Sequence, residues 1–247
     1  MHERFFAPDL EPDAGLVHLP VDEARHLVRV MRVRTGDAVR VFNGRGLERA
    51  GRVADIRRDD VSIALGECVA AAPEARTAIT LAQAVLKGDG MDGVIRDAVM
   101  LGVAAVAPVL TARVEGDRRS HAAGLRLGRW QRIAVASAKQ CGRAVVPAIL
   151  QPASLAACLA GTTTSVRLAL VEPDALPATT IRELAALPVP ASATVLVGPE
   201  GGWAEEELRL MEGHGTRGLR LGGRILRAES AALVGLSALH AVWGEFE

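Results

Sequence analysis

The chain has 247 residues, and its 29 basic residues balance its 29 acidic ones, so the formal net charge is zero. Hydrophobic residues make up 49% of the chain, enough to bury the core of one large domain or two modest ones. No apolar run reaches the roughly 18 residues that a membrane helix needs, and the first residues do not read as a secretory leader, so we expect a cytoplasmic protein without membrane contact.

Residues 1–70 are predicted to form a small β-barrel domain. Apolar segments of strand length lie at 16–19, 38–42, 49–56 and 61–65, separated by tight polar turns. One short helix, at about 22–31, interrupts them and places His26, Arg29 and Arg32 near one edge. An alanine- and proline-rich linker follows at 70–76.

Residues 77–247 are predicted to form a second domain in which strands alternate with helices. The predicted strands are 79–86, 103–109, 166–171 and 193–197, and the predicted helices are 91–101, 125–140 and 179–187. This alternation is typical of a mainly parallel sheet covered on both faces, with ligand sites at the carboxyl ends of its strands.

Two glycine-rich junctions stand out in the last fifth of the chain. In the first, an apolar strand runs into Gly198-Pro199-Glu200-Gly201-Gly202-Trp203, and a helix with three glutamates in its first turn follows. In the second, the short apolar segment 219–221 runs into Gly222-Gly223, before an Ala/Leu-rich helix at 231–243. Glycine permits close backbone approach, so two neighbouring junctions indicate one shared ligand pocket.

The segment 113–143 is locally basic. It carries eight basic residues against the two acidic residues Glu115 and Asp117; the basic ones are Arg113, Arg118, Arg119, Arg126, Arg129, Arg132, Lys139 and Arg143. Arginine suits bidentate phosphate contact, so this segment is a candidate phosphate-contacting face. The alternative is a solvated face whose arginines reflect codon usage. The three cysteines, Cys68, Cys141 and Cys158, lack metal or redox spacing, so no metal site is expected.

Residues 88–93 also match the pattern G-x-G-x-x-G, with an acidic residue about twenty positions later. That pattern is found in dinucleotide-binding oxidoreductases. Against this alternative, Asp89 would lie beside the cofactor phosphates and repel them.

Two long motifs resemble a known enzyme family. Gly198 to Glu207 and Leu221 to Ala231 (LGGRILRAESA) resemble the C-terminal signatures of the RsmE family of 16S rRNA (uridine-N3) methyltransferases, which belong to the SPOUT class. The resemblance extends over nearly the whole chain, through His26 to Arg32, Lys87-Gly88-Asp89 and Gln140 to Arg143. Met100 and Ser137 depart from it, because the family usually has a glutamate at each position.

The resemblance implies a fold, a cofactor and partners. The fold would be α/β, with a mainly parallel sheet of the SPOUT type. It would contain a deep trefoil knot, which is an exception to the rule that protein chains are not knotted. A PUA-like barrel that binds RNA would precede this domain. The cofactor would be S-adenosylmethionine, the substrate 16S rRNA in the small ribosomal subunit, and the assembly a homodimer. The implied cofactor-binding residues are Leu170, Val171, Glu172, Gly198, Pro199, Glu200, Gly201, Leu221, Gly222, Ile225 and Leu226.

Arg227 and Glu229 are the candidate catalytic residues. Methylation of uridine N3 requires loss of an imide proton, which a carboxylate can accept or pass to a water, whereas arginine stays protonated and can stabilise the uracil anion. The sequence leaves the identity of the base open. The candidate RNA-binding residues are His26, Arg29, Arg32, Lys87, Arg113, Arg118, Arg119 and Arg143. His26, Trp130 and Trp203 also fit purely structural roles.

Two other functions remain as alternatives at this point. A SPOUT ribose 2′-O-methyltransferase would share the fold and the cofactor and differ in its product. A non-catalytic RNA-binding or ribosome-assembly protein would have kept the fold alone, although the intact glycine junctions argue against it.

Overall fold

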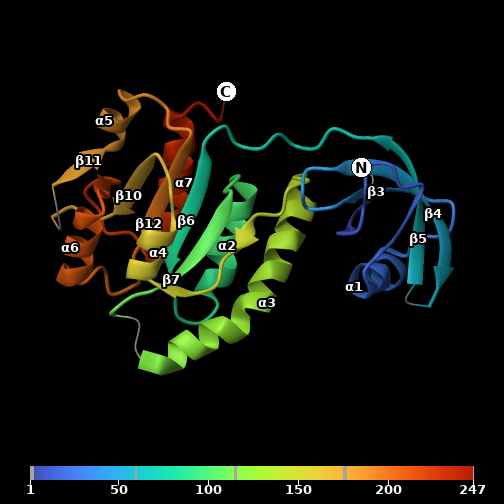
Figure 1. The fold of residues 1–247 in the computed structure, drawn as a ribbon, viewed down its shortest axis with the longest axis horizontal. Coiled ribbons are helices and arrows are strands. Elements are labelled where there is room, and N and C mark those ends of the chain that lie inside the picture. Colours follow the sequence, from blue (N-terminus) through green and yellow to red (C-terminus); the bar gives the residue numbers. More distant parts are fainter. Residues whose placement is uncertain (1–2, 59, 114–115, 175–176, 247) are drawn as a thin grey trace. The chain divides into compact units, whose positions relative to one another are not determined.

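The computed structural model describes residues 3–58, 60–113, 116–174 and 177–246, and for residues 116–125 it describes the backbone alone. The chain divides into two compact units, both drawn in Figure 1, which labels many of their helices and strands. The first comprises Met1–Glu74 and Val135–Val146, and the second comprises Ala75–Ala134 and Pro147–Glu247. The first unit is therefore built from two separate stretches of sequence.

The first unit contains a five-stranded sheet with strand order β1-β3-β4-β5-β2. Its strands are β1 (Glu3–Phe6), β2 (Leu16–His18), β3 (Ala38–Phe42), β4 (Glu48–Arg57) and β5 (Asp60–Cys68). β1 pairs with β3 in parallel, and the other recorded pairs are antiparallel. Phe5, Val41 and Ile63 are fully buried in one core. The four predicted strands are confirmed, whereas β1 was not predicted.

The predicted single helix at 22–31 is wrong in detail. The structure has a short α-helix, α1 (Val21–Arg25), that continues as a π-helix, η1 (His26–Met31), and stops at Arg32 with a left-handed backbone, φ 54°. The amide of Val33 donates to the carbonyl of Leu27 and closes this end. Periodicity does not distinguish α from π winding over so short a segment. His26 is half-buried here, and Arg29 and Arg32 are exposed.

Arg4 ties the end of helix α3 (Gly116–Cys141) to the sheet of the first unit. Its guanidinium donates to the carbonyl oxygens of Ala138 at 3.0 Å, Lys139 at 2.6 Å and Arg143 at 3.0 Å. It also pairs with the buried carboxylate of Glu48 at 2.7 Å. Removing one partner of such a buried pair typically costs about 3–5 kcal/mol, so loss of the Arg4 side chain should destabilise the unit, although Arg40 also lies 3.8 Å from Glu48.

The second unit is built on an eight-stranded sheet. Its order is β11-β13-β10-β12-β6-β7-β8, with β9 also on β7, and every recorded pairing is parallel. The strands are β6 (Ala78–Ala84), β7 (Ala105–Leu110), β8 (Ala148–Ile149), β9 (Ala153–Ser154), β10 (Val166–Leu170), β11 (Ala178–Thr180), β12 (Ser192–Val197) and β13 (Arg217–Arg220). The mainly parallel sheet is confirmed.

Helices cover both faces of this sheet. Ala82, Ala169 and Leu196 pack in one cluster with Leu159 of α4 (Leu155–Gly161) and Met211 of α6 (Glu205–Gly213). On the other face, α7 (Ala228–Val242) packs against β12 and against α2 (Gly90–Met100). Burial on both sides explains why these strands read as continuous apolar runs.

Several boundaries differ from the sequence prediction. The helix predicted at 179–187 is strand β11 followed by α5 (Ile181–Ala185), which Thr180 caps. Helix α3 begins at Gly116, well before residue 125. β8, β9 and α4 are too short to give a clear periodic signal. In the parts of the chain that the structure describes, no helix is long and apolar enough to cross a membrane.

Candidate active site

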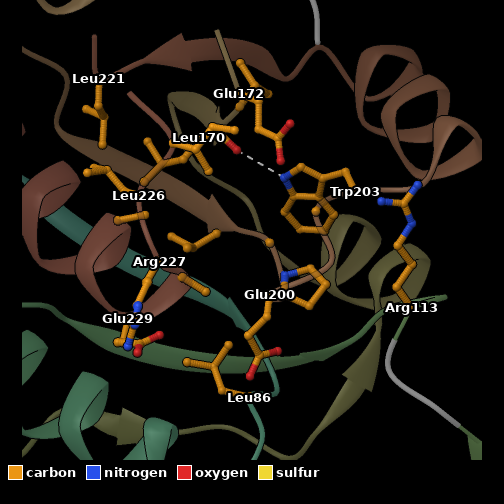
Figure 2. Close-up of a pocket in the computed structure, with 18 of the residues that line it drawn as sticks. Leu86, Arg113, Leu170, Glu172, Glu200, Trp203, Leu221, Leu226, Arg227 and Glu229 are labelled. Carbon is orange, nitrogen blue, oxygen red and sulfur yellow. Dashed lines mark hydrogen bonds between the residues drawn. The ribbon is translucent and has the colours of Figure 1, made fainter. Parts of the chain in front are cut away.

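A cavity of about 800 Å³ lies at the carboxyl ends of β10, β12 and β13 (Figure 2). Its position follows from the topology, because parallel strands end at the same edge of the sheet. All the predicted cofactor-binding residues except Gly201 line it: Leu170, Val171, Glu172, Gly198, Pro199, Glu200, Leu221, Gly222, Ile225 and Leu226. The structure therefore brings the two glycine junctions and the end of β10 to one cavity.

Gly201 is the exception, and Gly202 takes the place predicted for it. Gly202 lines the cavity with a left-handed backbone, φ 71°, and a Cβ there would lie 3.2 Å from the carboxylate of Glu172. Gly201 does not line the cavity, and its carbonyl accepts a hydrogen bond from Arg113. The sequence pattern identifies the glycine turn but not which glycine faces the cavity.

Side chains of the first glycine turn hold the ends of neighbouring strands. The carboxylate of Glu200 accepts from the backbone amide of Lys87 at 2.9 Å, just after β6. The indole Nε1–H of Trp203 donates to the carbonyl of Leu170, the last residue of β10, at 3.1 Å, drawn dashed in Figure 2. These contacts fix the width of the cavity, and sequence reasoning missed them.

Glu207 forms a third contact of this kind, with the segment that follows β7. Its buried carboxylate accepts from the amide of Ala112 at 2.8 Å and from the amide of Ala204 at 2.9 Å. It therefore caps the start of α6 and fixes the segment that carries Arg113. In the sequence, only the three glutamates in the first turn of this helix pointed to the cap.

The lining fits a flat apolar ring joined to a cationic chain. Leu170, Leu221 and Leu226 provide apolar walls. At Gly222, φ 120°, a Cβ would meet none of the described atoms within 4 Å, so the backbone borders open space that a ligand can approach closely. Three carboxylates, Glu172, Glu200 and Glu229, also line the cavity. An adenine ring and a positively charged sulfonium and ammonium match these groups, so the residues fit S-adenosylmethionine.

Arg227 and Glu229 both line the cavity, and Figure 2 draws their side chains in the same part of the view. Arg227 is the N-cap of α7, and Glu229 is in its first turn. Both side chains are exposed, so they reach solvent and the cavity at once.

The predicted RNA-binding residues fall into three groups. Lys87 and Arg113 line the cavity of the second unit. His26, Arg29 and Arg32 belong to the first unit. Arg118 and Arg119 lie outside the residues whose side chains the structure describes.

The prediction that Arg143 contacts RNA is corrected by its burial. Arg143 is 3% exposed, and its guanidinium forms a two-point contact with the carboxylate of Glu74, with Nε to Oε1 at 3.1 Å. Arg129 forms a salt bridge with Asp92, and Arg126 donates a hydrogen bond to the carbonyl of Gly88 at 2.5 Å. Part of the basic segment therefore stabilises the fold. Trp130, fully buried, is confirmed as a core residue.

Comparison with known proteins identifies the family. A model described as an RNA methyltransferase domain matches residues 73–240, and one described as an RNA methyltransferase PUA domain matches residues 19–65. A curated relative from Synechocystis, ribosomal RNA small subunit methyltransferase E, is 30% identical, and the match covers 92% of this chain and 73% of that protein. The chain belongs to the ribosomal RNA small subunit methyltransferase E family.

Solved structures agree with this assignment. A ribosomal RNA small subunit methyltransferase E from Neisseria gonorrhoeae, bound to S-adenosylmethionine, is 30% identical over 100% of both chains, with a TM-score of 0.88. A methyltransferase from Legionella pneumophila with the same bound cofactor is 31% identical over 98% of both chains, also with a TM-score of 0.88. The α/β class with a PUA-like N-terminal domain is confirmed, and the dinucleotide-binding oxidoreductase alternative is wrong.

Proposed function

We propose that this methyltransferase E family member transfers the methyl group of S-adenosylmethionine to N3 of one uridine in 16S rRNA. The observation that carries the proposal is the cavity itself. Its glycine-bordered, apolar part suits the cofactor, and its other end presents Arg227 and Glu229 to an acceptor. Crystallised relatives that hold S-adenosylmethionine support the choice of cofactor.

The chain's own residues orient and deprotonate the acceptor in this proposal. The cofactor, when bound, supplies an already activated methyl carbon. The carboxylate of Glu229 accepts the N3 proton of the uracil, directly or through a water, while the guanidinium of Arg227 stabilises the negative charge that develops on the ring. N3 then forms a bond to the methyl carbon as the carbon–sulfur bond breaks, leaving S-adenosylhomocysteine. Fixed geometry also contributes to the rate, because holding N3 and the methyl carbon in line lowers the entropic cost of bringing them together.

The proposal also covers the domains, the oligomeric state and the cellular location of the protein. We place the PUA-like domain at residues 1–70, with His26, Arg29 and Arg32 contacting RNA, and the SPOUT domain with its knot at residues 77–247. A homodimer is supported by the exposed apolar side chains of Leu233 and Val234 on α7, 40% and 41% exposed. A cytoplasmic enzyme that meets the small ribosomal subunit there completes the proposal.

Nucleoside analysis tests the reaction. Small subunits from a strain lacking the gene should gain one 3-methyluridine per 16S rRNA when incubated with the purified protein and isotopically labelled S-adenosylmethionine. Mass spectrometry of the digested RNA separates this product from 2′-O-methyluridine. Finding 2′-O-methyluridine would establish the ribose methyltransferase alternative, and finding no labelled nucleoside would favour a non-catalytic role.

Charge removal tests the proposed RNA contacts at the cavity. Lys87→Gln and Arg113→Gln should each weaken binding to a small-subunit RNA fragment and reduce the slope of log affinity against log salt by about 0.7–0.9, because each phosphate contact releases counterions. Arg209→Gln is the matched control, since Arg209 is exposed, pairs with Glu205 and does not line the cavity. Equal salt slopes for all three variants and the wild type would exclude these phosphate contacts.

A further inference from the structure

Leu170 forms one wall of the cavity, and its backbone is held in place. It is the last residue of β10 and is only 7% exposed. Its carbonyl accepts the hydrogen bond from the indole of Trp203, whose ring also lies 3.1 Å from where a Cβ on Gly198 would be. Any crowding of the Leu170 side chain must therefore be relieved by the side chain itself, because the backbone is tied to the neighbouring junction.

The side chain of Leu170 rests on a glycine of the last helix. A Cβ built on Gly235 would lie 2.8 Å from Cδ1 of Leu170 and 3.4 Å from Cδ2. Real Cβ atoms do not approach other carbons this closely. Gly235 is in the interior of α7, where glycine costs about 0.5–1 kcal/mol relative to alanine, so helix formation does not favour it. The close contact with Leu170 is what glycine permits here.

We propose that Gly235 is a positioning residue for the cofactor cavity. It does not line the cavity itself. By lacking a Cβ, it lets the Leu170 side chain pack down onto α7, which keeps the two Cδ atoms out of the space where the cofactor binds. With an alanine at this position, Leu170 has to move, and the open space that borders it is the cavity. This inference rests on the proposed use of the cavity for S-adenosylmethionine.

Calorimetry with S-adenosylhomocysteine tests the proposal. Gly235→Ala should lower the affinity about tenfold, because the added methyl group displaces the Leu170 side chain, and the space that borders this side chain is the cavity. At saturating cofactor, kcat should stay near the wild-type value. Gly93→Ala is the matched control, because Gly93 is inside α2 and a Cβ there would meet no described atom within 4 Å. That variant should bind as the wild type does.

A second substitution shows whether the effect passes through Leu170. Leu170→Ala should itself weaken binding by removing a wall, but adding Gly235→Ala to it should cost nothing further, since the crowded atoms are gone. This double variant also relieves the strain and should fold if Gly235→Ala alone does not. If the double variant lost as much affinity as the two single variants lose together, the proposal would be overturned. Wild-type affinity in Gly235→Ala would also overturn it.

A ligand-free measurement separates this proposal from the proposed function. In methyl NMR spectra of the free protein, the Leu170 signals should shift in Gly235→Ala and stay unchanged in Gly93→Ala. Unshifted Leu170 signals in Gly235→Ala would overturn the inference. If the Leu170 signals shift in Gly235→Ala but the wild-type protein has no affinity for S-adenosylhomocysteine, the proposed cofactor is overturned. The packing role of Gly235 is then left intact.

Discussion

Gly202→Val should abolish measurable binding of S-adenosylhomocysteine, with a loss of at least about a hundredfold, while Gly201→Val should lose less than about tenfold. Gly202 has a left-handed backbone that strains a branched side chain, and its Cβ would crowd the carboxylate of Glu172 inside the cavity. A Cβ on Gly201 would meet only the side chain of Arg113, at 3.4 Å or more.

Calorimetry on both variants measures this difference, and circular dichroism checks that each is folded. Gly202→Ala separates the two causes, because it has the backbone strain without the branched methyl groups and should lie between the wild type and Gly202→Val. If Gly201→Val lost more affinity than Gly202→Val, the cavity would not be the cofactor site as described.

Arg227→Ala and Glu229→Gln should each slow methyl transfer by about 10²–10⁴-fold and leave the affinity for S-adenosylhomocysteine nearly unchanged. Both side chains are exposed and line the cavity, and the proposed function places the acceptor against them. Arg227→Lys should recover only part of the rate, because a point charge does not reproduce the planar guanidinium.

Single-turnover rates at saturating cofactor measure these effects. Ser230→Ala is the control, since Ser230 is exposed beside Glu229 but does not line the cavity. Near-wild-type turnover in both Arg227→Ala and Glu229→Gln would remove these residues from the mechanism and leave positioning as the source of the rate.

Local patterns predicted most of the longer strands and helices and the location of the cavity. Continuous apolar runs such as Ser192–Val197 predicted strands buried on both faces, and the glycines that follow predicted the junction at the carboxyl ends. β1 was missed because its identity as a strand depends on pairing with β3, about 36 residues later in the sequence, which a local pattern does not encode.

Contacts between distant residues account for most of what the sequence did not predict. Trp203 donates to a carbonyl 33 residues away, and Arg143 reaches a carboxylate 69 residues away. The basic run containing Arg143 suggested a surface, but charge in a sequence does not distinguish a solvated guanidinium from one buried on a carboxylate. The choice between Gly201 and Gly202 likewise depends on backbone direction within a turn, to which both glycines are equally suited.

The division of the first unit into two stretches has a consequence for its synthesis. Residues 3–74 leave the ribosome before the segment Val135–Val146 is translated. The guanidinium of Arg4 can therefore bind the carbonyls of Ala138, Lys139 and Arg143 only later. By the time they emerge, α2 and β7 of the second unit have already been translated. The N-terminal unit is thus first in the chain, but it completes its contacts only after Ala75–Ala134 of the second unit have been translated. A fragment ending at residue 74 would contain its sheet without the helix end that Arg4 contacts.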